Sequence, residues 1–161
     1  MAKVRVLFVC LGNICRSPTA EGVFKKLVAD AGLADAFEID SAGTSGWHAG
    51  EPPDPRSQAE ALRHGIDLSG QRSRAVAASD FTRFDYIVAM DGENLRELRK
   101  RCPVPLQGRL HQLMSFAPSL GVADVPDPYY GGHSGFADVF NIVSAGANGL
   151  LAAITARRGV D

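Results

Sequence analysis

Two reactive side chains stand at the ends of one short segment near the start of the chain. Cys10 is followed, after five intervening residues, by Arg16, and Gly12 and Asn13 lie between them. A thiolate is a strong nucleophile, and a guanidinium can bind two oxygens of a tetrahedral oxyanion. Glycine and asparagine tolerate the backbone conformations that turn a short loop around an anion. The segment therefore predicts an anion-binding loop with its own nucleophile, which suits phosphoryl transfer through cysteine.

The segments on either side of this loop have to position it. Residues 4–9 are apolar with little alternation, which is typical of a strand buried on both faces of a parallel sheet. Ser17 suits a helix N-cap and Pro18 the first helical position, and the helical spacing continues to residue 31. A strand that leads through a polar loop into a helix directs N–H groups and the positive helix end at a bound anion.

Strand and helix patterns alternate along the rest of the chain. We expect strands at 37–42, at 84–90 and within 104–114, and helices at 54–64, 78–83, 91–102 and 134–157. This alternation predicts an α/β fold with a parallel, twisted, four-stranded sheet and helices on both faces. Ligands bind at the carboxyl ends of such strands. The Cys10 loop and the turns at 41–43 and 90–91 should meet there.

The composition limits the class of protein. The chain has 161 residues, of which 45% are hydrophobic, so we expect residues 1–161 to form a single domain. A formal net charge of -1 gives no reason to expect binding to nucleic acid or to a membrane surface. The chain shows neither a signal-peptide pattern nor a run approaching about 20 apolar residues. Three cysteines, an odd number, do not suggest a disulfide framework. We expect a soluble, cytoplasmic protein, and its oligomeric state is left open.

The segment Cys10-Leu11-Gly12-Asn13-Ile14-Cys15-Arg16-Ser17-Pro18 resembles the signature of the low-molecular-weight protein tyrosine phosphatases of bacterial type. The resemblance covers essentially the whole chain. The other segments that carry it are Asp40-Ser41-Ala42-Gly43, Trp47, Pro53-Asp54-Pro55-Arg56, His64-Gly65-Ile66, Met90-Asp91, Asn94-Leu95 and Asp127-Pro128-Tyr129-Tyr130-Gly131. It implies a phosphatase I-like fold and hydrolysis of phosphotyrosine and other aryl phosphates. It also implies a phosphotyrosine-containing protein as substrate and inorganic phosphate as product and competitive ligand.

The resemblance assigns a role to each catalytic residue. Cys10 would form a phosphocysteine intermediate, and Asp127 would act first as general acid and then as general base. Without the resemblance, Asp91, Asp124 and Asp127 are equal candidates for the acid. The phosphoryl oxygens would be bound by the Arg16 side chain and by the loop N–H groups of Leu11, Gly12, Asn13, Ile14, Cys15 and Arg16. These donors neutralise the charge, so neither a metal nor a cofactor is expected.

The resemblance also predicts which side chains hold the loop in shape. Asn13 would be fixed by Ser17 and Ser41, and Ser17 could also hydrogen-bond the Cys10 sulfur. Family members often add a histidine to this network. Gln71 stands at that place here, and glutamine can donate and accept hydrogen bonds but cannot titrate.

Three aromatic residues are predicted around the mouth of the site. Trp47, Tyr129 and Tyr130 would line the substrate crevice, because aromatic walls suit an aryl phosphate. Trp47 could instead be a core anchor. The two tyrosines could themselves be phosphorylated. Cys15 could trap an oxidised Cys10 as a disulfide, or it could simply pack behind the loop. The four histidines show no metal-ligand spacing, and we expect none of them to be catalytic.

Three alternative functions stay open. A protein-arginine phosphatase of the same fold usually has threonine where Ile14 stands, so Ile14 favours phosphotyrosine. A thiol-dependent arsenate reductase needs a relay of cysteines, and only Cys15 and Cys102 remain besides the nucleophile. A non-enzymatic anion-binding protein would need neither Cys10 nor Asp127. The sequence does not identify the physiological phosphoprotein.

Overall fold

A four-stranded sheet forms the centre of the molecule, and all its strands run parallel in the order β2-β1-β3-β4. The computed structural model describes residues 3–129 and 133–158. The strands are β1 (Val4–Cys10), β2 (Phe37–Gly43), β3 (Tyr86–Ala89) and β4 (Leu110–Gln112). The α/β fold with a parallel, four-stranded sheet is therefore confirmed. The carboxyl ends of β1, β2 and β3 meet at one edge, where the Cys10 loop lies.

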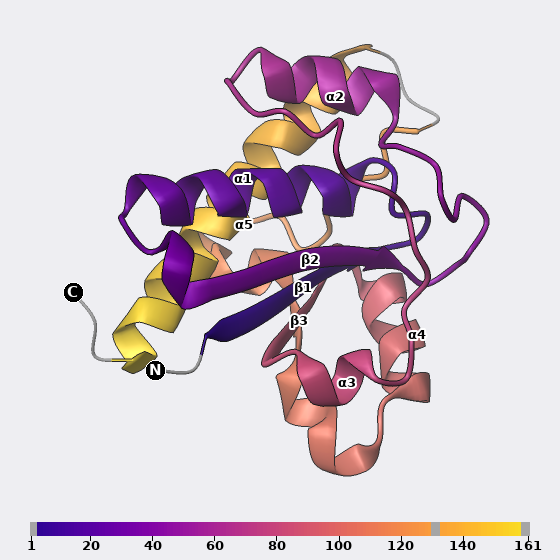
Figure 1. The fold of residues 1–161 in the computed structure, drawn as a ribbon, viewed down its shortest axis with the longest axis vertical. Coiled ribbons are helices and arrows are strands. Elements are labelled where there is room, and N and C mark those ends of the chain that lie inside the picture. The colour runs from indigo at the N-terminus through magenta and orange to yellow at the C-terminus, as the bar shows by residue number, and fades with distance from the viewer. Residues whose placement is uncertain (1–2, 130–132, 159–161) are drawn as a thin grey trace.

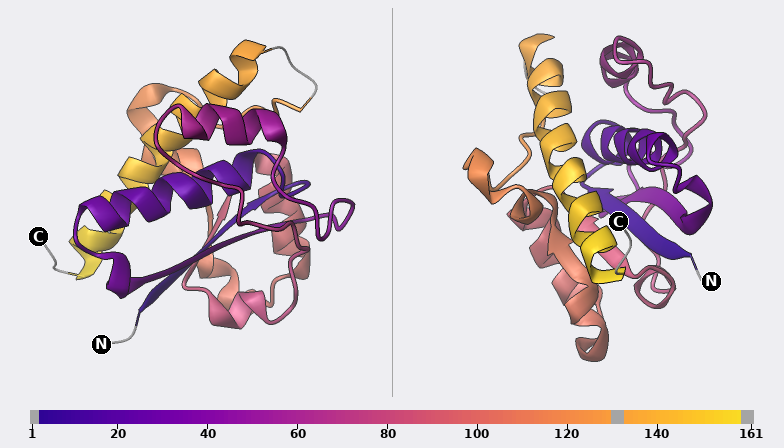
Figure 2. Two further views of the ribbon diagram at one scale, coloured as in Figure 1. Left: turned by 45° about the horizontal axis from the view of Figure 1, so that its top comes forward. Right: turned by 90° about the vertical axis from the view of Figure 1, so that its left-hand side faces the viewer.

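Helices cover both faces of this sheet (Figures 1 and 2). They are α1 (Arg16–Asp30), α2 (Pro55–Leu62), α3 (Asp80–Arg83), α4 (Gly92–Arg101) and α5 (His133–Arg158). Alternate residues of β1 face opposite sides. Val6 and Phe8 belong to the core formed with α1 and α5, and Leu7 and Val9 to the core formed with α3 and α4. Strand β1 is thus buried on both faces, as its sequence predicted.

The start of one helix was assigned wrongly. Helix α1 begins at Arg16 with Cys15 as its N-cap, so the assignment of Ser17 as N-cap and Pro18 as first helical residue was wrong. The Ser17 hydroxyl is bound to the loop instead of capping the helix. The segment 104–114 contains one short strand, β4, between the 3-10 helices Val104–Arg109 and Leu113–Phe116. Pro105 lies in the first turn of the former, where it offers no N–H group for a strand ladder.

Helix α5 is the one described helix that is apolar and long enough to cross a membrane, with a mean hydropathy of 1.5 over its most apolar stretch between Gly135 and Arg157. Polar residues such as Asp138, Asn141 and Asn148 interrupt this helix, so it is not an unbroken run of about 20 apolar residues. Several of its apolar residues, among them Val143, Ala147 and Leu150, pack in the core with α1.

Two glycines in the interior of α5 are sites of close approach. A Cβ on Gly149 would lie 1.9 Å from the carbonyl oxygen of Phe116, and one on Gly146 would lie 2.6 Å from Leu113.

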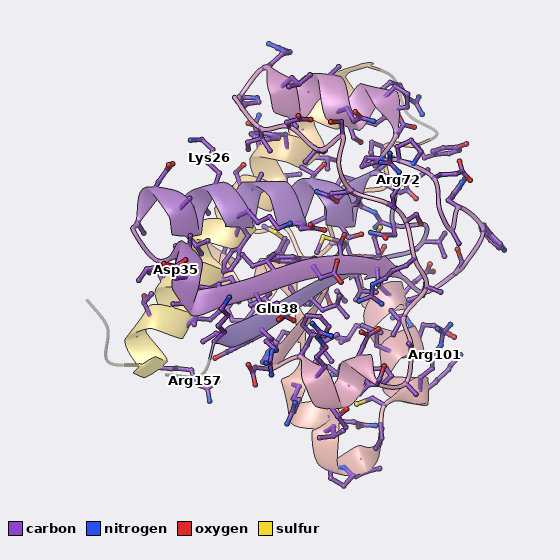
Figure 3. All side chains as sticks on the ribbon, in the orientation of Figure 1. Lys26, Asp35, Glu38, Arg72, Arg101 and Arg157 are labelled. Atoms are coloured by element: carbon purple, nitrogen blue, oxygen red, sulfur yellow. The ribbon has the colours of Figure 1, made fainter. Side chains whose placement is uncertain are left out.

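Charged side chains of both signs are spread over several elements (Figure 3). Glu38 on β2 pairs with Arg83 at 2.6 Å, and Lys26 pairs with Asp30 within α1 at 3.0 Å. Arg101 on α4 forms a similar pair within its own helix. Exposed pairs of this kind contribute little to stability. An anion site in this molecule therefore depends on a local arrangement of donors.

Candidate active site

The loop between β1 and α1 is held in one shape by its own backbone and by its neighbours. Cys10 is the last residue of β1, and Arg16 is the first of α1. Asn13 has a φ of 57°, the one positive φ of a non-glycine residue among those described. The end of β2 passes close by, because a Cβ on Gly43 would lie 2.7 Å from the carbonyl oxygen of Leu11. Only glycine allows this approach.

The Cys10 sulfur lies among hydrogen-bond donors. It accepts a hydrogen bond from the backbone N–H of Asn13 at 3.3 Å and lies 3.0 Å from the Ser17 hydroxyl. The Asn13 amide donates to that hydroxyl oxygen at 2.9 Å, so the Ser17 hydrogen can be directed at the sulfur in preference to the Ala42 carbonyl oxygen, which lies further away at 3.5 Å. Two donors directed at one sulfur suit a sulfur that carries negative charge.

A chain of buried side chains extends behind the loop. The Asn13 amide nitrogen also donates to the Ser41 hydroxyl at 2.9 Å, and the Asn13 amide oxygen accepts from the N–H of Arg74 at 3.0 Å. The Ser41 hydroxyl in turn donates to the Glu21 carboxylate at 2.7 Å. The structure thus places Asn13, Ser17 and Ser41 together, where the sequence analysis expected the supporting network. Glu21 and Arg74 complete it, and the sequence analysis missed both.

Gln71 takes no part in this chain among the described contacts. Its amide nitrogen donates to the carbonyl oxygen of Pro18 at 3.1 Å. Its amide oxygen is buried and has no hydrogen-bond partner among the described residues. Gln71 therefore braces the first turn of α1, and Glu21 supplies the buried acceptor for Ser41.

Arg16 is almost fully buried, and negative groups surround it. Its Nη1 donates to Asp91 Oδ2 at 2.5 Å and to the carbonyl oxygen of Val125 at 3.0 Å, and its Nη2 lies 3.6 Å from Asp127 Oδ2. Burial alone would lower the pKa of Arg16, but the negative charge of the Cys10 sulfur, Asp91 and Asp127 raises it above its ordinary value. The guanidinium is therefore a fixed positive charge beside the sulfur.

The three aspartates that the sequence left as candidate acids lie in different surroundings. Asp91 caps α4 and binds the arginine of the loop. Asp124 accepts a hydrogen bond from the Gln112 amide at 2.6 Å, away from the cysteine. Asp127 lines the pocket above the loop with its side chain 36% exposed, and its Oδ1 accepts from the N–H of Tyr129 at 3.0 Å. Of the three, Asp127 is the one that a bound ligand would meet.

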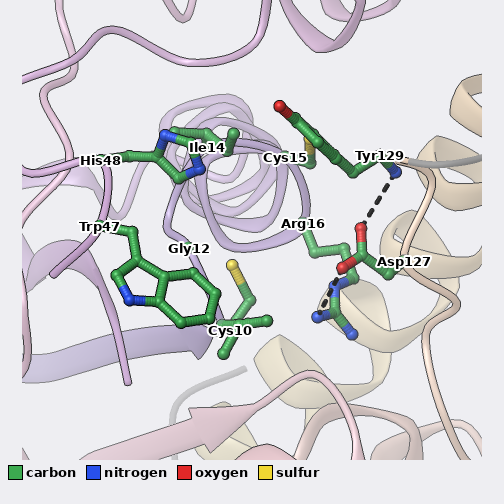
Figure 4. A pocket seen from close by; sticks show the side chains of 10 residues that line it. Cys10, Gly12, Ile14, Cys15, Arg16, Trp47, His48, Asp127 and Tyr129 are labelled. Atoms are coloured by element: carbon green, nitrogen blue, oxygen red, sulfur yellow. Dashed lines mark hydrogen bonds and ion pairs between the residues drawn. The ribbon is translucent and has the colours of Figure 1, made fainter. Parts of the chain in front are cut away.

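The pocket above Cys10 is small and has apolar upper walls. Its volume is about 60 Å³, room for a few water molecules at about 10–15 Å³ each. Its lining consists of Cys10, Leu11, Gly12, Ile14, Cys15, Arg16, Trp47, His48, Asp127 and Tyr129 (Figure 4). Trp47 is 77% exposed, so a core role for it is wrong, and its ring stands at the mouth of the pocket. Tyr130 lies outside the described residues.

Comparison with known proteins identifies this arrangement. Residues 5–159 match the family model described as low molecular weight phosphotyrosine protein phosphatase. The chain belongs to this family. A low molecular weight protein-tyrosine-phosphatase of Streptomyces coelicolor is 48% identical over 153 residues, which cover 93% of each chain. The family resemblance and the phosphatase class predicted from the sequence are confirmed.

Solved structures of the phosphatase family agree with this fold. A protein tyrosine phosphatase of Entamoeba histolytica, with Hepes in its active site, is 40% identical and has a TM-score of 0.92 over 98% of this chain and 99% of that one. A Drosophila arginine phosphatase is 35% identical, with a TM-score of 0.86 over 92% of this chain and 96% of that one. The fold therefore occurs in proteins named for two different phosphorylated side chains.

His48 is a pocket residue of this phosphatase that the sequence analysis missed. Its ring lies beside the loop, since a Cβ on Gly12 would come within 3.1 Å of it. Its Nδ1 is 3.0 Å from Glu51, and its ring centroid is 6.2 Å from that of Tyr129. The signal in the sequence was its position next to Trp47. No group of three side chains able to hold a metal was found among residues 3–129 and 133–158.

Cys15 lines the same pocket but is a weakly ionising thiol. Burial raises its pKa to about 12. All three cysteines are free thiols, and Cys102 packs in the core beside α4. The capture of an oxidised Cys10 by Cys15 stays a prediction.

Proposed function

We propose that this phosphatase hydrolyses phosphotyrosine in proteins through a phosphocysteine on Cys10, with Asp127 as proton donor and acceptor. The observation that carries the proposal is that one small pocket brings together the Cys10 sulfur, the Arg16 guanidinium and the Asp127 carboxyl group. Transfer of a phosphoryl group to an enzyme needs three groups: a nucleophile, a cation that binds the oxyanion, and an acid. Cys10 and Arg16 lie at the two ends of one loop, and Asp127 lies on a separate segment that meets this loop at the pocket.

In the first step, the Cys10 thiolate donates an electron pair to phosphorus and forms a P–S bond. The P–O bond to the tyrosine ring breaks, its electron pair passes to the phenolic oxygen, and Asp127 gives that oxygen its proton. Arg16 and the N–H groups of residues 11–16 bind the equatorial oxygens. The products are a free tyrosine side chain and a phosphocysteine.

In the second step, water attacks the phosphocysteine. The Asp127 carboxylate takes a proton from the water as the P–O bond forms, and the P–S bond breaks with its electron pair returning to sulfur. The hydrogen bonds from Ser17 and from the Asn13 N–H stabilise this leaving thiolate. Inorganic phosphate is released, and as a product it competes with substrate. The cycle consumes one water and needs no cofactor.

The walls of the pocket support an aryl substrate. Ile14, Trp47 and Tyr129 present apolar and aromatic surface above the anion-binding floor. A phosphotyrosine ring that enters far enough to place its phosphate over Cys10 would contact these side chains. Because the three cysteines are free thiols, a reducing compartment suits this chain, and we place the enzyme in the cytoplasm.

Phosphoarginine is the second candidate substrate, because the Drosophila arginine phosphatase shares the fold. Ile14 disfavours it, since an apolar side chain offers no hydrogen bond to a guanidinium. An arsenate reductase is disfavoured for another reason: Cys15, the second thiol at the site, has a pKa of about 12 and would be a poor attacking thiol in a relay.

The test compares wild type with Cys10→Ser, Asp127→Ala and the control Cys102→Ala on phosphotyrosine and phosphoarginine peptides. We expect no turnover with Cys10→Ser, a loss of about 10²–10⁴-fold on phosphotyrosine with Asp127→Ala, and wild-type rates with Cys102→Ala. Equal rates for wild type and Cys10→Ser would exclude covalent catalysis at Cys10. Faster hydrolysis of phosphoarginine would overturn the substrate assignment.

A further inference from the structure

Arg56, in the first turn of α2, connects three segments around the pocket. Its Nε and Nη2 donate to the two carboxylate oxygens of Asp54 at 3.0 and 2.9 Å. Its Nη2 also donates to the carbonyl oxygen of Tyr129 at 3.3 Å. The guanidinium carbon lies 5.6 Å from the centroid of the Tyr129 ring and 4.6 Å from that of Phe136 in α5. One side chain thus joins α2, the segment that follows Asp127 and the start of α5.

One end of this connection reaches the nucleophile loop. The backbone N–H of Asp54 donates to the carbonyl oxygen of Ile14 at 2.8 Å. The buried Asp54 carboxylate caps α2 by accepting from the N–H of Arg56 at 2.8 Å. Asp54 is therefore fixed by both its backbone and its side chain, and the guanidinium that it holds cannot swing freely.

The other end reaches the acid. The N–H of Tyr129 donates to Asp127 Oδ1 at 3.0 Å, while Arg16 Nη2 lies 3.6 Å from Oδ2 of the same carboxyl group (Figure 4). Asp127 is thus held between two donors, and Tyr129 keeps its place partly through the bond from its carbonyl oxygen to Arg56. Loss of Arg56 would loosen Tyr129 and so weaken its hydrogen bond to the Asp127 carboxyl group. The attraction of that carboxyl group to Arg16 would then decide its position.

We propose that Arg56 is a positioning residue for general acid catalysis, which it serves by fixing Tyr129 and through it the Asp127 carboxyl group. The inference rests on the proposed function. Arg56 contacts no reacting atom in this arrangement. The planar guanidinium is essential, because it donates hydrogen bonds to both Asp54 oxygens and to the Tyr129 carbonyl oxygen while it also contacts two aromatic rings. A lysine ammonium cannot make all these contacts at once.

The test uses leaving groups of different quality. Variants Arg56→Met and Arg56→Lys are compared with Arg63→Met, which removes an exposed arginine at the end of the same helix. The value of kcat/KM is measured with p-nitrophenyl phosphate, whose leaving group needs little protonation, and with phenyl phosphate, whose leaving group needs it. We expect both Arg56 variants to lose on the order of tenfold more activity on phenyl phosphate than on p-nitrophenyl phosphate, and Arg63→Met to lose equally little on both.

A double variant separates positioning from general damage. In an Asp127→Asn background the acid is absent, so Arg56→Met should no longer change the ratio of the two substrates. An unchanged ratio in Arg56→Met itself, or the same added loss in both backgrounds, would overturn the inference and leave a purely structural role. A wild type that hydrolyses neither substrate would instead contradict the proposed function. Thermal unfolding of each variant shows whether lost activity reflects lost fold.

Discussion

The Asn13 side chain should stabilise the folded protein and, separately, prepare its loop for an anion. Asn13 combines a positive φ of 57° with three side-chain hydrogen bonds in a buried site. Two substitutions divide these contributions. Asn13→Gly removes the three bonds and accepts the backbone conformation, whereas Asn13→Ala removes the same bonds and also strains the backbone.

The size of each effect follows from these contacts. Each hydrogen bond contributes about 0.5–1.5 kcal/mol, so the loss of the three bonds should lower the free energy of unfolding of Asn13→Gly by about 1.5–4.5 kcal/mol. Alanine in the left-handed region costs about 1–2 kcal/mol, and glycine has its own cost of about 0.5–1 kcal/mol in the unfolded chain. Asn13→Ala should therefore be about 1 kcal/mol less stable than Asn13→Gly.

Urea unfolding of both variants, with and without phosphate, measures both contributions. Wild type should gain stability with phosphate, by about 2.7 kcal/mol at a hundredfold excess over its dissociation constant, and the variants should gain less because their loops are not held open. Asn141→Ala, at an exposed position of α5, is the matched control and should behave as wild type. Equal stabilities of Asn13→Ala and Asn13→Gly would refute the argument from backbone strain. A full phosphate response in both would refute the argument from loop support.

Three further predictions concern other parts of the molecule. Because burial raises the pKa of Cys15 to about 12, iodoacetamide should leave Cys15 unmodified in the folded protein and label it after unfolding; native labelling, found by peptide mapping, would contradict this. Burial lowers the pKa of His111 below its ordinary value of 6.5, so the unfolded chain binds the proton more readily than the folded protein does. The urea midpoint should therefore fall as the pH drops below 6.5, and it should fall less in His111→Gln. Gly149→Ala should lose about 1–3 kcal/mol or more, because its Cβ would collide with the Phe116 backbone. Gly135→Ala, where the new Cβ meets only ordinary contacts, should keep its melting temperature.

Features that depend on neighbouring residues could be predicted from the sequence. The unbroken apolar run of β1 predicted a strand buried on both faces, and the strand has this environment. The helix expected at 54–64 begins with Asp54 followed by Pro55, a pair typical of a capped start, and the Asp54 carboxylate accepts the hydrogen bond that a cap requires. The cap depends on residues close together along the chain, and the burial of β1 depends only on how apolar the strand is.

Local preference failed where a distant partner competed for the same group. Ser17 is a typical N-cap residue, yet its hydroxyl binds Cys10 and Asn13, and the helix begins two residues earlier than predicted, without a side-chain cap. The N–H of Arg74 that binds Asn13 lies 61 residues further along the chain. No spacing rule relates two such positions, so neither contact could be deduced before the fold was known.

Trp47 was ambiguous for a different reason. Large apolar side chains are usually buried, but an exposed aromatic ring beside a polar cavity is also typical of a binding surface. Burial depends on whether the rest of the chain covers the ring, and the loop from Gly43 to Pro53 leaves it open. Whether Trp47 lies in the core or at the crevice therefore depends on the whole fold.

The position of Arg16 links anion binding to the placement of the acid. Its Nη1 is occupied by Asp91 and by the carbonyl oxygen of Val125, two groups that follow β3 and precede Asp127. Its Nη2 is the group near Asp127, and the oxygens of an anion in the pocket would compete for it. An anion that takes Nη2 would release Asp127 Oδ2 while Tyr129 still holds Oδ1. In the proposed mechanism, substrate binding would thereby free the Asp127 oxygen that delivers the proton, and the carboxyl group would stay in place because its other oxygen is bound.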